Sequence, residues 1–126
     1  MKHQRSRVRF PKIHYPVYLS KHSMSRLKQR AGLNTKQKRE SFLKAAAKNS
    51  LTLSEIPKDV AEFASFAHYM RKLQYKIRER DSSCRAYLYK EFFLIISFDG
   101  IVVTVLNVEG YPGIYEEIVN YLLSED

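Results

Sequence analysis

Apolar residues recur every three or four positions in the first half of the chain, which is the spacing of an amphipathic helix. In residues 21–31 the apolar side consists of Met24, Leu27 and Ala31. The preceding Ser20 is a favourable N-cap, and Gly32 suits a helix stop. We therefore predict a first helix from Lys21 to Ala31.

Two further helices are predicted by the same spacing. The second follows a cap at Asn34 or Thr35 and runs to about Asn49, with apolar positions at Phe42, Leu43, Ala46 and Ala47. The third covers residues 54–73, with Pro57 in its first turn. Its apolar positions are Val60, Phe63, Ala64, Ala67 and Met70.

After Tyr75 the period changes to two, which indicates β-strands. Residues 75–80 predict a first strand, residues 81–83 a turn, and residues 84–89 a second strand. Alternation places Cys84, Ala86 and Leu88 on one face of the second strand. It places Arg85, Tyr87 and Tyr89 on the other face.

The next segment, residues 92–98, is apolar on both faces, as a central strand should be, with Leu94 and Ile96 in the core. Asp99-Gly100 predicts a two-residue hairpin turn, and residues 101–108 the returning strand. Gly110 to Gly113 ends that strand, and residues 114–123 predict a closing helix.

Together these elements predict an α+β fold, with N-terminal helices packed on a roughly four-stranded antiparallel sheet and a short C-terminal helix. The helices should cover one face of the sheet. The other face should carry Arg85, Tyr87 and Tyr89, or else pack the last helix. Residues 13–126 are expected to form a single domain, in which residues 14–19 are a short extended piece.

Residues 1–12 predict a basic arm, ordered only if it meets a partner or folds back as an edge strand. The arm has no apolar stretch behind it, as a secretory signal would. The longest apolar run, residues 92–97, is too short to span a bilayer. We therefore expect a cytoplasmic protein that does not bind a membrane.

The sequence contains no recognisable motif for binding a metal or a cofactor. Cys84 is the single cysteine, and the four histidines lie at unrelated spacings. The four glycines form neither a Walker loop nor a dinucleotide-binding loop. We expect neither a metal nor a cofactor, and Cys84 is interpreted as a small core residue.

Charge is divided unevenly along the chain. The first fifty residues carry fourteen Lys and Arg and one acid, Glu40, whereas the other seventy-six carry eight basic and twelve acidic residues. The net charge of +9 is thus about +13 in the first part and about −4 in the second. A concentrated positive field favours polyanions, of which nucleic acid is the commonest. The predicted contact residues are Lys28, Arg30, Lys36, Lys38, Arg39 and Lys44.

One group of side chains in this sequence suits metal-independent RNA cleavage. That reaction needs a base near the 2′-oxygen, cations on the phosphate and an acid for the leaving oxygen. His22 and Arg26 share a helical face with Arg30, and Arg85 and Tyr87 share a strand face. His22, Arg26, Arg85 and Tyr87 are therefore the candidate catalytic residues. A nucleic-acid contact or a structural position is the alternative interpretation of His22.

Residues 20–32, with His22, Arg26 and Arg30 in a His-x3-Arg-x3-Arg pattern, resemble the opening of small bacterial and phage domains. These domains are related to RelE-type toxins and to the wider barnase, EndoU, colicin and RelE-like RNase superfamily. Tyr87, residues 92–98 and residues 103–105 look like the sheet of that family. The resemblance implies metal-independent RNA cleavage or an inactive RNA-binding derivative, with a cognate antitoxin as a further partner.

A second hypothesis requires no catalysis. A small basic protein can act as an inhibitor or regulator that binds nucleic acid or occupies the nucleic-acid channel of a host nucleoprotein, such as a guided nuclease. A ribosome-associated accessory protein is a third alternative. In every case the expected partner is nucleic acid, RNA more than DNA, or a nucleoprotein target of the host.

Overall fold

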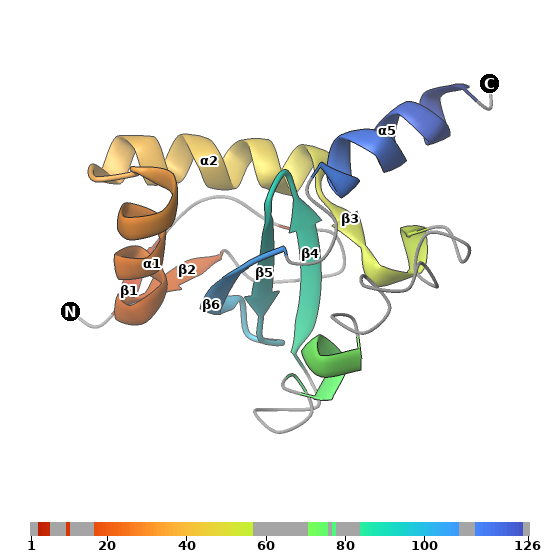
Figure 1. Cartoon of the computed structure of the whole chain (residues 1–126). Coiled ribbons are helices and arrows are strands. Elements are labelled where there is room, and N and C mark those ends of the chain that lie inside the picture. The colour runs from red at the N-terminus through yellow and green to blue at the C-terminus, as the bar shows by residue number, and fades with distance from the viewer. Residues whose placement is uncertain are drawn as a thin grey trace.

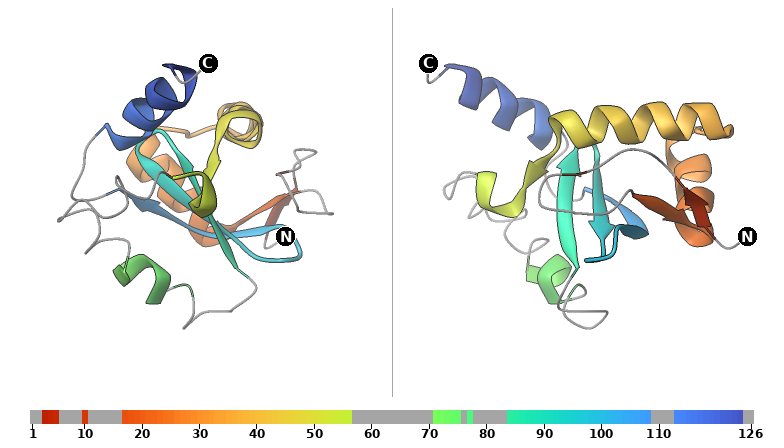
Figure 2. Two further views of the ribbon diagram at one scale, coloured as in Figure 1. Left: turned by 90° about the vertical axis from the view of Figure 1, so that its right-hand side faces the viewer. Right: turned by 180° about the vertical axis from the view of Figure 1, so that it is seen from behind.

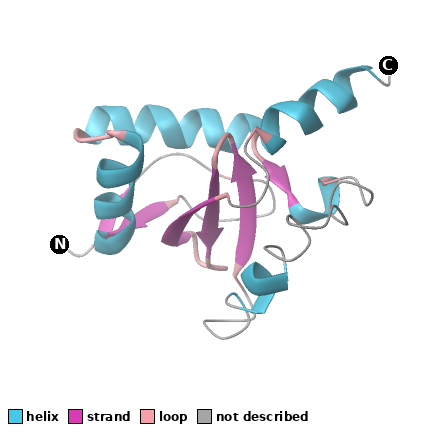
Figure 3. Ribbon diagram, viewed as in Figure 1, coloured by secondary structure: helices cyan, strands magenta, loops and turns pink. Residues whose placement is uncertain are grey.

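The computed structural model describes residues 3–5, 10, 17–56, 71–75, 77, 84–108 and 113–124 (Figure 1). It confirms the α+β class: helices and a mixed sheet share one core, as the colouring by secondary structure in Figure 3 shows. In chain order the elements are β1 (His3–Arg5), β2 (Tyr18–Ser20), α1 (Lys21–Ala31), α2 (Lys36–Asn49), β3 (Leu51–Thr52), a 3-10 turn (Leu53–Glu55), β4 (Arg85–Tyr89), β5 (Phe92–Ile96), β6 (Ile101–Asn107) and α5 (Ile114–Ser124).

The described residues form a six-stranded sheet in the order β1-β2-β6-β5-β4-β3, so the predicted number of about four is too low. All neighbours are antiparallel except β2 and β6, which are parallel, and the prediction of a purely antiparallel sheet is wrong at this pair. The extra strands β1, β2 and β3 are two or three residues long. Strands this short show no alternation that a sequence pattern could reveal.

The strand predicted for residues 75–80 is wrong where the structure describes it, because residues 71–75 and 77 are helical. The place beside β4 is taken by β3, in which Leu51 pairs with Leu88 and Thr52 with Tyr87. The third predicted helix is a 3-10 turn at its start, and its final residues 71–73 are helical. Its middle part, residues 57–70, lies outside the described residues.

Local capping fixes both N-terminal helices at the predicted ends. The Ser20 hydroxyl accepts a hydrogen bond from the Ser23 amide at 3.0 Å, and the Thr35 hydroxyl accepts one from the Lys38 amide at 3.1 Å. Gly32 ends α1 with φ of +67°, a left-handed conformation that glycine adopts without steric cost. Figure 2 shows α1 and α2 crossing steeply after this break.

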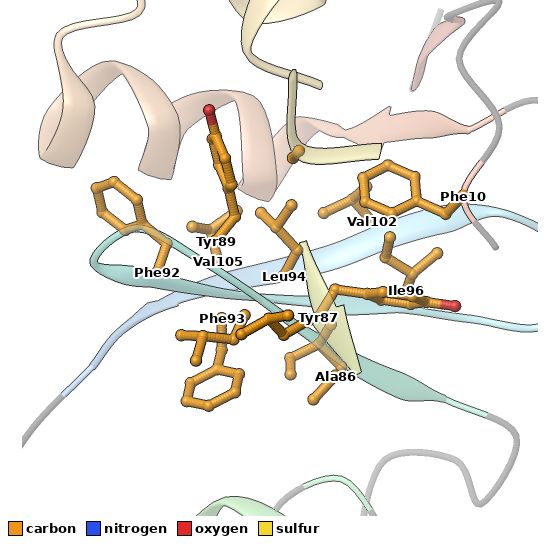
Figure 4. Packing of buried hydrophobic residues seen from close by; sticks show 14 of the residues in the cluster. Phe10, Ala86, Tyr87, Tyr89, Phe92, Phe93, Leu94, Ile96, Val102 and Val105 are labelled. Atoms are coloured by element: carbon orange, nitrogen blue, oxygen red, sulfur yellow. The ribbon is translucent and has the colours of Figure 1, made fainter. Parts of the chain in front are cut away.

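The core lies on both faces of the central strand β5, whose five residues are all buried. The prediction that Leu94 and Ile96 are core residues is confirmed, because both are fully buried. Figure 4 shows Tyr89, Phe92 and Leu94 pointing to one side of the sheet, and Phe93 and Ala86 to the other. Leu27 of α1 and Leu43 of α2 are fully buried in the same cluster.

The face of the sheet covered by helices carries Arg85, Tyr87 and Tyr89, for which the sequence predicts the other face. Tyr89 contacts Phe42 of α2 edge-to-face at a centroid distance of 5.5 Å. It also contacts Tyr115 of α5 at 5.5 Å. Arg85, Tyr87 and Tyr89 are alternate residues of β4, so all three lie on the same face of the sheet. This face packs against both α2 and α5. The prediction that it faces away from the N-terminal helices is therefore wrong.

The turn between β5 and β6 is longer than predicted. The Ser97 amide donates to the Ile101 carbonyl at 2.9 Å, and the Gly100 amide donates to the Ser97 carbonyl at 3.0 Å. The loop is therefore the three residues Phe98, Asp99 and Gly100, in place of a two-residue turn at Asp99-Gly100. Gly100 has φ of +89°, as the last residue of such a three-residue loop requires. Phe98, predicted to end the strand, lies in the loop.

Candidate nucleic-acid interface

Side-chain hydrogen bonds join helix α1 and its N-cap to β6, beginning at the residue where the pairing of β2 with β6 ends. The parallel pairing of β2 and β6 ends at Leu19 and Val102, because the chain turns into α1 at Ser20. Three side chains of this segment donate to backbone carbonyls of β6. These hydrogen bonds run from Ser23 Oγ to Val102 at 2.5 Å, from Ser20 Oγ to Val103 at 3.4 Å, and from Arg30 Nη1 to Val105 at 3.0 Å.

His22 and Arg26 form a pair on the same side of α1, about two turns and one turn before Arg30 respectively. Arg26 Nε donates to His22 Nε2 at 3.3 Å, as their i, i+4 spacing allows. In this bond the guanidinium is the donor and the imidazole nitrogen the acceptor. His22 is exposed and Arg26 is partly buried, so the pair faces solvent.

Arg30, Arg39 and Lys38 each donate a hydrogen bond to another residue of the protein, although Lys38 is exposed. Arg30 bonds Val105 of β6, and Arg39 Nη1 donates to the Leu33 carbonyl in the α1–α2 connection at 3.1 Å. Lys38 Nζ donates to Asn34 Oδ1 at 3.3 Å. Three of the six predicted contact residues therefore donate hydrogen bonds within the protein. Lys28, Lys36 and Lys44 are exposed on the outer sides of the helices.

Arg85 and Tyr87 lie on β4, away from His22 and Arg26. Strands β5 and β6 separate β4 from α1, which contacts β6, β2 and β1 (Figure 1). Arg85 is exposed, and its Nη1 donates to the carbonyl of Cys84 at 3.1 Å. The structure thus brings His22 and Arg26 together and places the other two candidate catalytic residues elsewhere.

Tyr87 is a core residue. Its ring packs edge-to-face against Phe10 at a centroid distance of 5.1 Å, and its side chain is almost fully buried. Burial raises the pKa of the Tyr87 phenol above its usual value, and the nearby Arg85 charge opposes that effect. A buried phenol with a raised pKa keeps its proton at neutral pH and is poorly placed to meet a substrate.

Helices α1 and α2 carry a strong excess of positive charge. Together they contain nine Lys and Arg and one carboxylate, Glu40, and neither helix has an acid in its first turn. Six of the nine are exposed lysines: Lys21, Lys28, Lys36, Lys38, Lys44 and Lys48. We call these six side chains the lysine surface. Lys21 and Lys48 were not among the predicted contacts, although the charge count of the first fifty residues includes them.

Within the described residues, no group of three or more His, Cys, Asp or Glu side chains is arranged to hold a metal ion. Among those same residues, no helix has both the length and the apolar character needed to cross a bilayer. Comparison with models of known protein families, with curated proteins and with solved structures finds no match to this chain.

Proposed function

We propose that this protein binds nucleic acid, RNA in preference to DNA, through the lysine surface of α1 and α2. The observation that carries the proposal is the exposure of six lysines on two consecutive helices that hold a single carboxylate. Lysines at such positions neutralise phosphates and release counterions, which supplies most of the affinity of a sequence-independent binder. The preference for RNA rests on the resemblance of the His22, Arg26 and Arg30 pattern to RNA-cleaving domains.

The proposed activity is binding without cleavage. Metal-independent cleavage needs a base, a phosphate-binding cation and an acid at one place. Here the Nε2 atom of His22 accepts from Arg26, and the Tyr87 phenol lies in the core on another strand. This arrangement supports a binding module or an inactive derivative of an RNase more than it supports an active RNase.

RNA cleavage is the second candidate function, and the exposed His22–Arg26 pair is the observation in its favour. On RNA binding, Arg26 could exchange its bond to His22 for a bond to a phosphate. The His22 imidazole would then be available to act as base or acid. In that case His22→Ala should lower the cleavage rate by about 10²–10⁴-fold. Arg26→Ala should lower it through lost stabilisation of the phosphate.

One experiment separates the two candidates. A labelled single-stranded RNA is incubated with the purified protein in EDTA, and both the bound fraction and the RNA length are measured. Binding with RNA that stays intact supports the proposed function. Cutting that disappears in His22→Ala while affinity remains supports the RNase. An RNA that is neither bound nor cut at low salt contradicts both candidates.

A further inference from the structure

We propose that the β5–β6 turn is a stacking platform for an unpaired nucleobase, with Phe98 beneath the base and Arg85 on a flanking phosphate. The inference rests on the proposed function and narrows its ligand to single-stranded nucleic acid. The lysine surface supplies affinity for phosphates. An aromatic platform adds contact with the bases, which no lysine provides.

Phe98 is a large apolar side chain held in an exposed position. It is 62% exposed, in contrast to the buried residues of β5 that precede it. Several hydrogen bonds hold the turn that carries Phe98. Ser97 Oγ donates to the Asp99 carboxylate, the Ile101 amide donates to Ser97 Oγ at 3.1 Å, and the Gly100 amide donates to the Ser97 carbonyl. A fixed turn presents the ring with little conformational entropy to lose on binding.

A cation lies beside this turn. Arg85 pairs with Ile96, two residues before Phe98, and the start of β4 lies beside the turn at the lower end of the sheet in Figure 1. Arg85 is exposed, and its guanidinium carries five N–H donors, so it can bind a phosphate in addition to partners within the protein such as the Cys84 carbonyl. Asp99 is the acidic neighbour, and its carboxylate accepts from Ser97 within the turn.

On the opposite side, β2 connects the turn to the lysine surface. The Tyr18 amide donates to the Gly100 carbonyl at 2.7 Å, and two residues later Ser20 begins α1 with Lys21 and His22. A strand bound along α1 could therefore continue past β2 to the turn. The aromatic ring would lie between the cations of α1 and Arg85.

The ligand that fits this arrangement is single-stranded. In a duplex each base is stacked on its neighbours and its π-face is covered, whereas unpaired bases can stack on aromatic side chains. Stacking of one base corresponds to about 5- to 100-fold in affinity. Phe98→Ala should therefore weaken binding to single-stranded RNA within that range and leave duplex binding unchanged.

The chain has no tryptophan, so Phe98→Trp creates a single fluorescent reporter at the proposed platform. A matched control is Tyr75→Trp, because Tyr75 is 65% exposed and lies after Arg71 and Lys72 in the 71–75 helix. The left view of Figure 2 shows this helix apart from the β5–β6 turn. We expect an oligouridine of about ten nucleotides to quench the emission of the Phe98→Trp variant strongly and that of Tyr75→Trp weakly. Fluorescence polarisation of the labelled oligonucleotide gives the affinity of each variant in parallel.

The outcomes distinguish this inference from the function it rests on. Wild-type binding with no quenching at position 98 and no loss of affinity in Phe98→Ala overturns the platform and leaves the lysine surface intact. Quenching at position 75 with none at position 98 also overturns it. A wild-type protein that binds no oligonucleotide contradicts the proposed function, and the platform with it.

Discussion

At the scale of single residues, cations of the same helices have two different tasks. The side chains of Arg30 and Arg39 donate hydrogen bonds to the backbone carbonyls of Val105 and Leu33. Lys28 and Lys44 extend into solvent. A guanidinium has several donors and a weakly held hydration shell, so it suits bonds to partly buried carbonyls better than an ammonium does. The lysines are therefore the better candidates for contact with phosphates.

A comparison on α1 tests this division. Arg30→Ala removes a charged hydrogen bond to β6 and should lower the free energy of unfolding by about 1.5–3 kcal/mol. Lys28→Ala, two residues earlier and exposed, should change it by less than about 0.5 kcal/mol. Urea denaturation followed by circular dichroism gives both values. Equal effects of the two substitutions would show that Arg30 does not hold α1 to the sheet.

Two tyrosines predict how stability depends on alkaline pH. Burial raises the pKa of Tyr87. Burial is also the largest cause of the raised pKa of Tyr115, followed by the nearby Tyr89 and Glu116. The Tyr115 hydroxyl donates to the Asn49 carbonyl at 2.7 Å. The folded protein then holds these phenol protons more tightly than the unfolded chain does. Their contribution to stability is complete below the unfolded pKa, about 10, and is lost as the pH rises through the folded pKa values.

The melting temperature should consequently fall as the pH is raised above about 10. The variant with both Tyr87→Phe and Tyr115→Phe is expected to lose less stability between pH 9 and pH 11 than the wild type does, although it starts from a lower value. Tyr75→Phe, at an exposed position, is the control. A double variant whose melting temperature falls as steeply as that of the wild type would contradict this assignment.

At the scale of elements, the predictable parts are those whose signals lie close together in the sequence. The caps of α1 and α2, the strand that ends at Tyr89 and the all-apolar β5 follow from local patterns, and the structure confirms them. The partners β1, β2 and β3 depend on contacts between distant segments, such as Tyr18 with Ile101 and Leu51 with Leu88. Those pairings leave no periodic signal in strands of two or three residues.

The candidate site shows the same limit. Helical spacing predicts the His22–Arg26 contact, and the charge count predicts a basic surface on α1 and α2. The inward bond of Arg30 depends on β6 losing its partner after Val102, which spacing on one helix does not reveal. The apolar run continues through Phe98 and predicts a strand there, and only the turn hydrogen bonds place Phe98 outside the strand.

The central strand β5 is buried at all five of its residues. Leu94 is fully buried between β4 and β6, where it pairs with Tyr87 and Val105. Leu94→Ala should lower the free energy of unfolding by about 2–5 kcal/mol, through lost apolar burial and the cavity that remains. Phe98→Ala, four residues later and exposed, is the matched control and should change it by less than about 0.5 kcal/mol. Thermal or urea denaturation measures both, and an unchanged Leu94→Ala stability would remove β5 from the core.

At the scale of the whole molecule, charge is separated in space as well as in sequence. Helices α1 and α2 hold nine cations and one carboxylate, whereas α5 holds Glu116 and Glu117 and no Lys or Arg. In Figure 1 α1 and α5 lie at opposite sides of the molecule, with α2 between them. A polyanion approaching in solution is expected to meet the α1 side first, because the field there is more positive.

The most direct test of the central proposal is the salt dependence of RNA binding in two charge-reversed double variants. Lys21→Glu with Lys44→Glu changes the lysine surface, and Arg71→Glu with Lys72→Glu changes an exposed pair elsewhere. Each variant lowers the net charge by four, from +9 to +5, so the two differ only in where the charge is lost.

The measurement is the affinity for single-stranded RNA between 50 and 200 mM salt. The proposal predicts that the Lys21–Lys44 variant binds more weakly and that its slope of log K against log salt is smaller by up to about 1.4, because each lost phosphate contact removes about 0.7. The Arg71–Lys72 variant should keep the wild-type slope. Equal losses in both variants, or none in the first, would contradict binding through the lysine surface of α1 and α2.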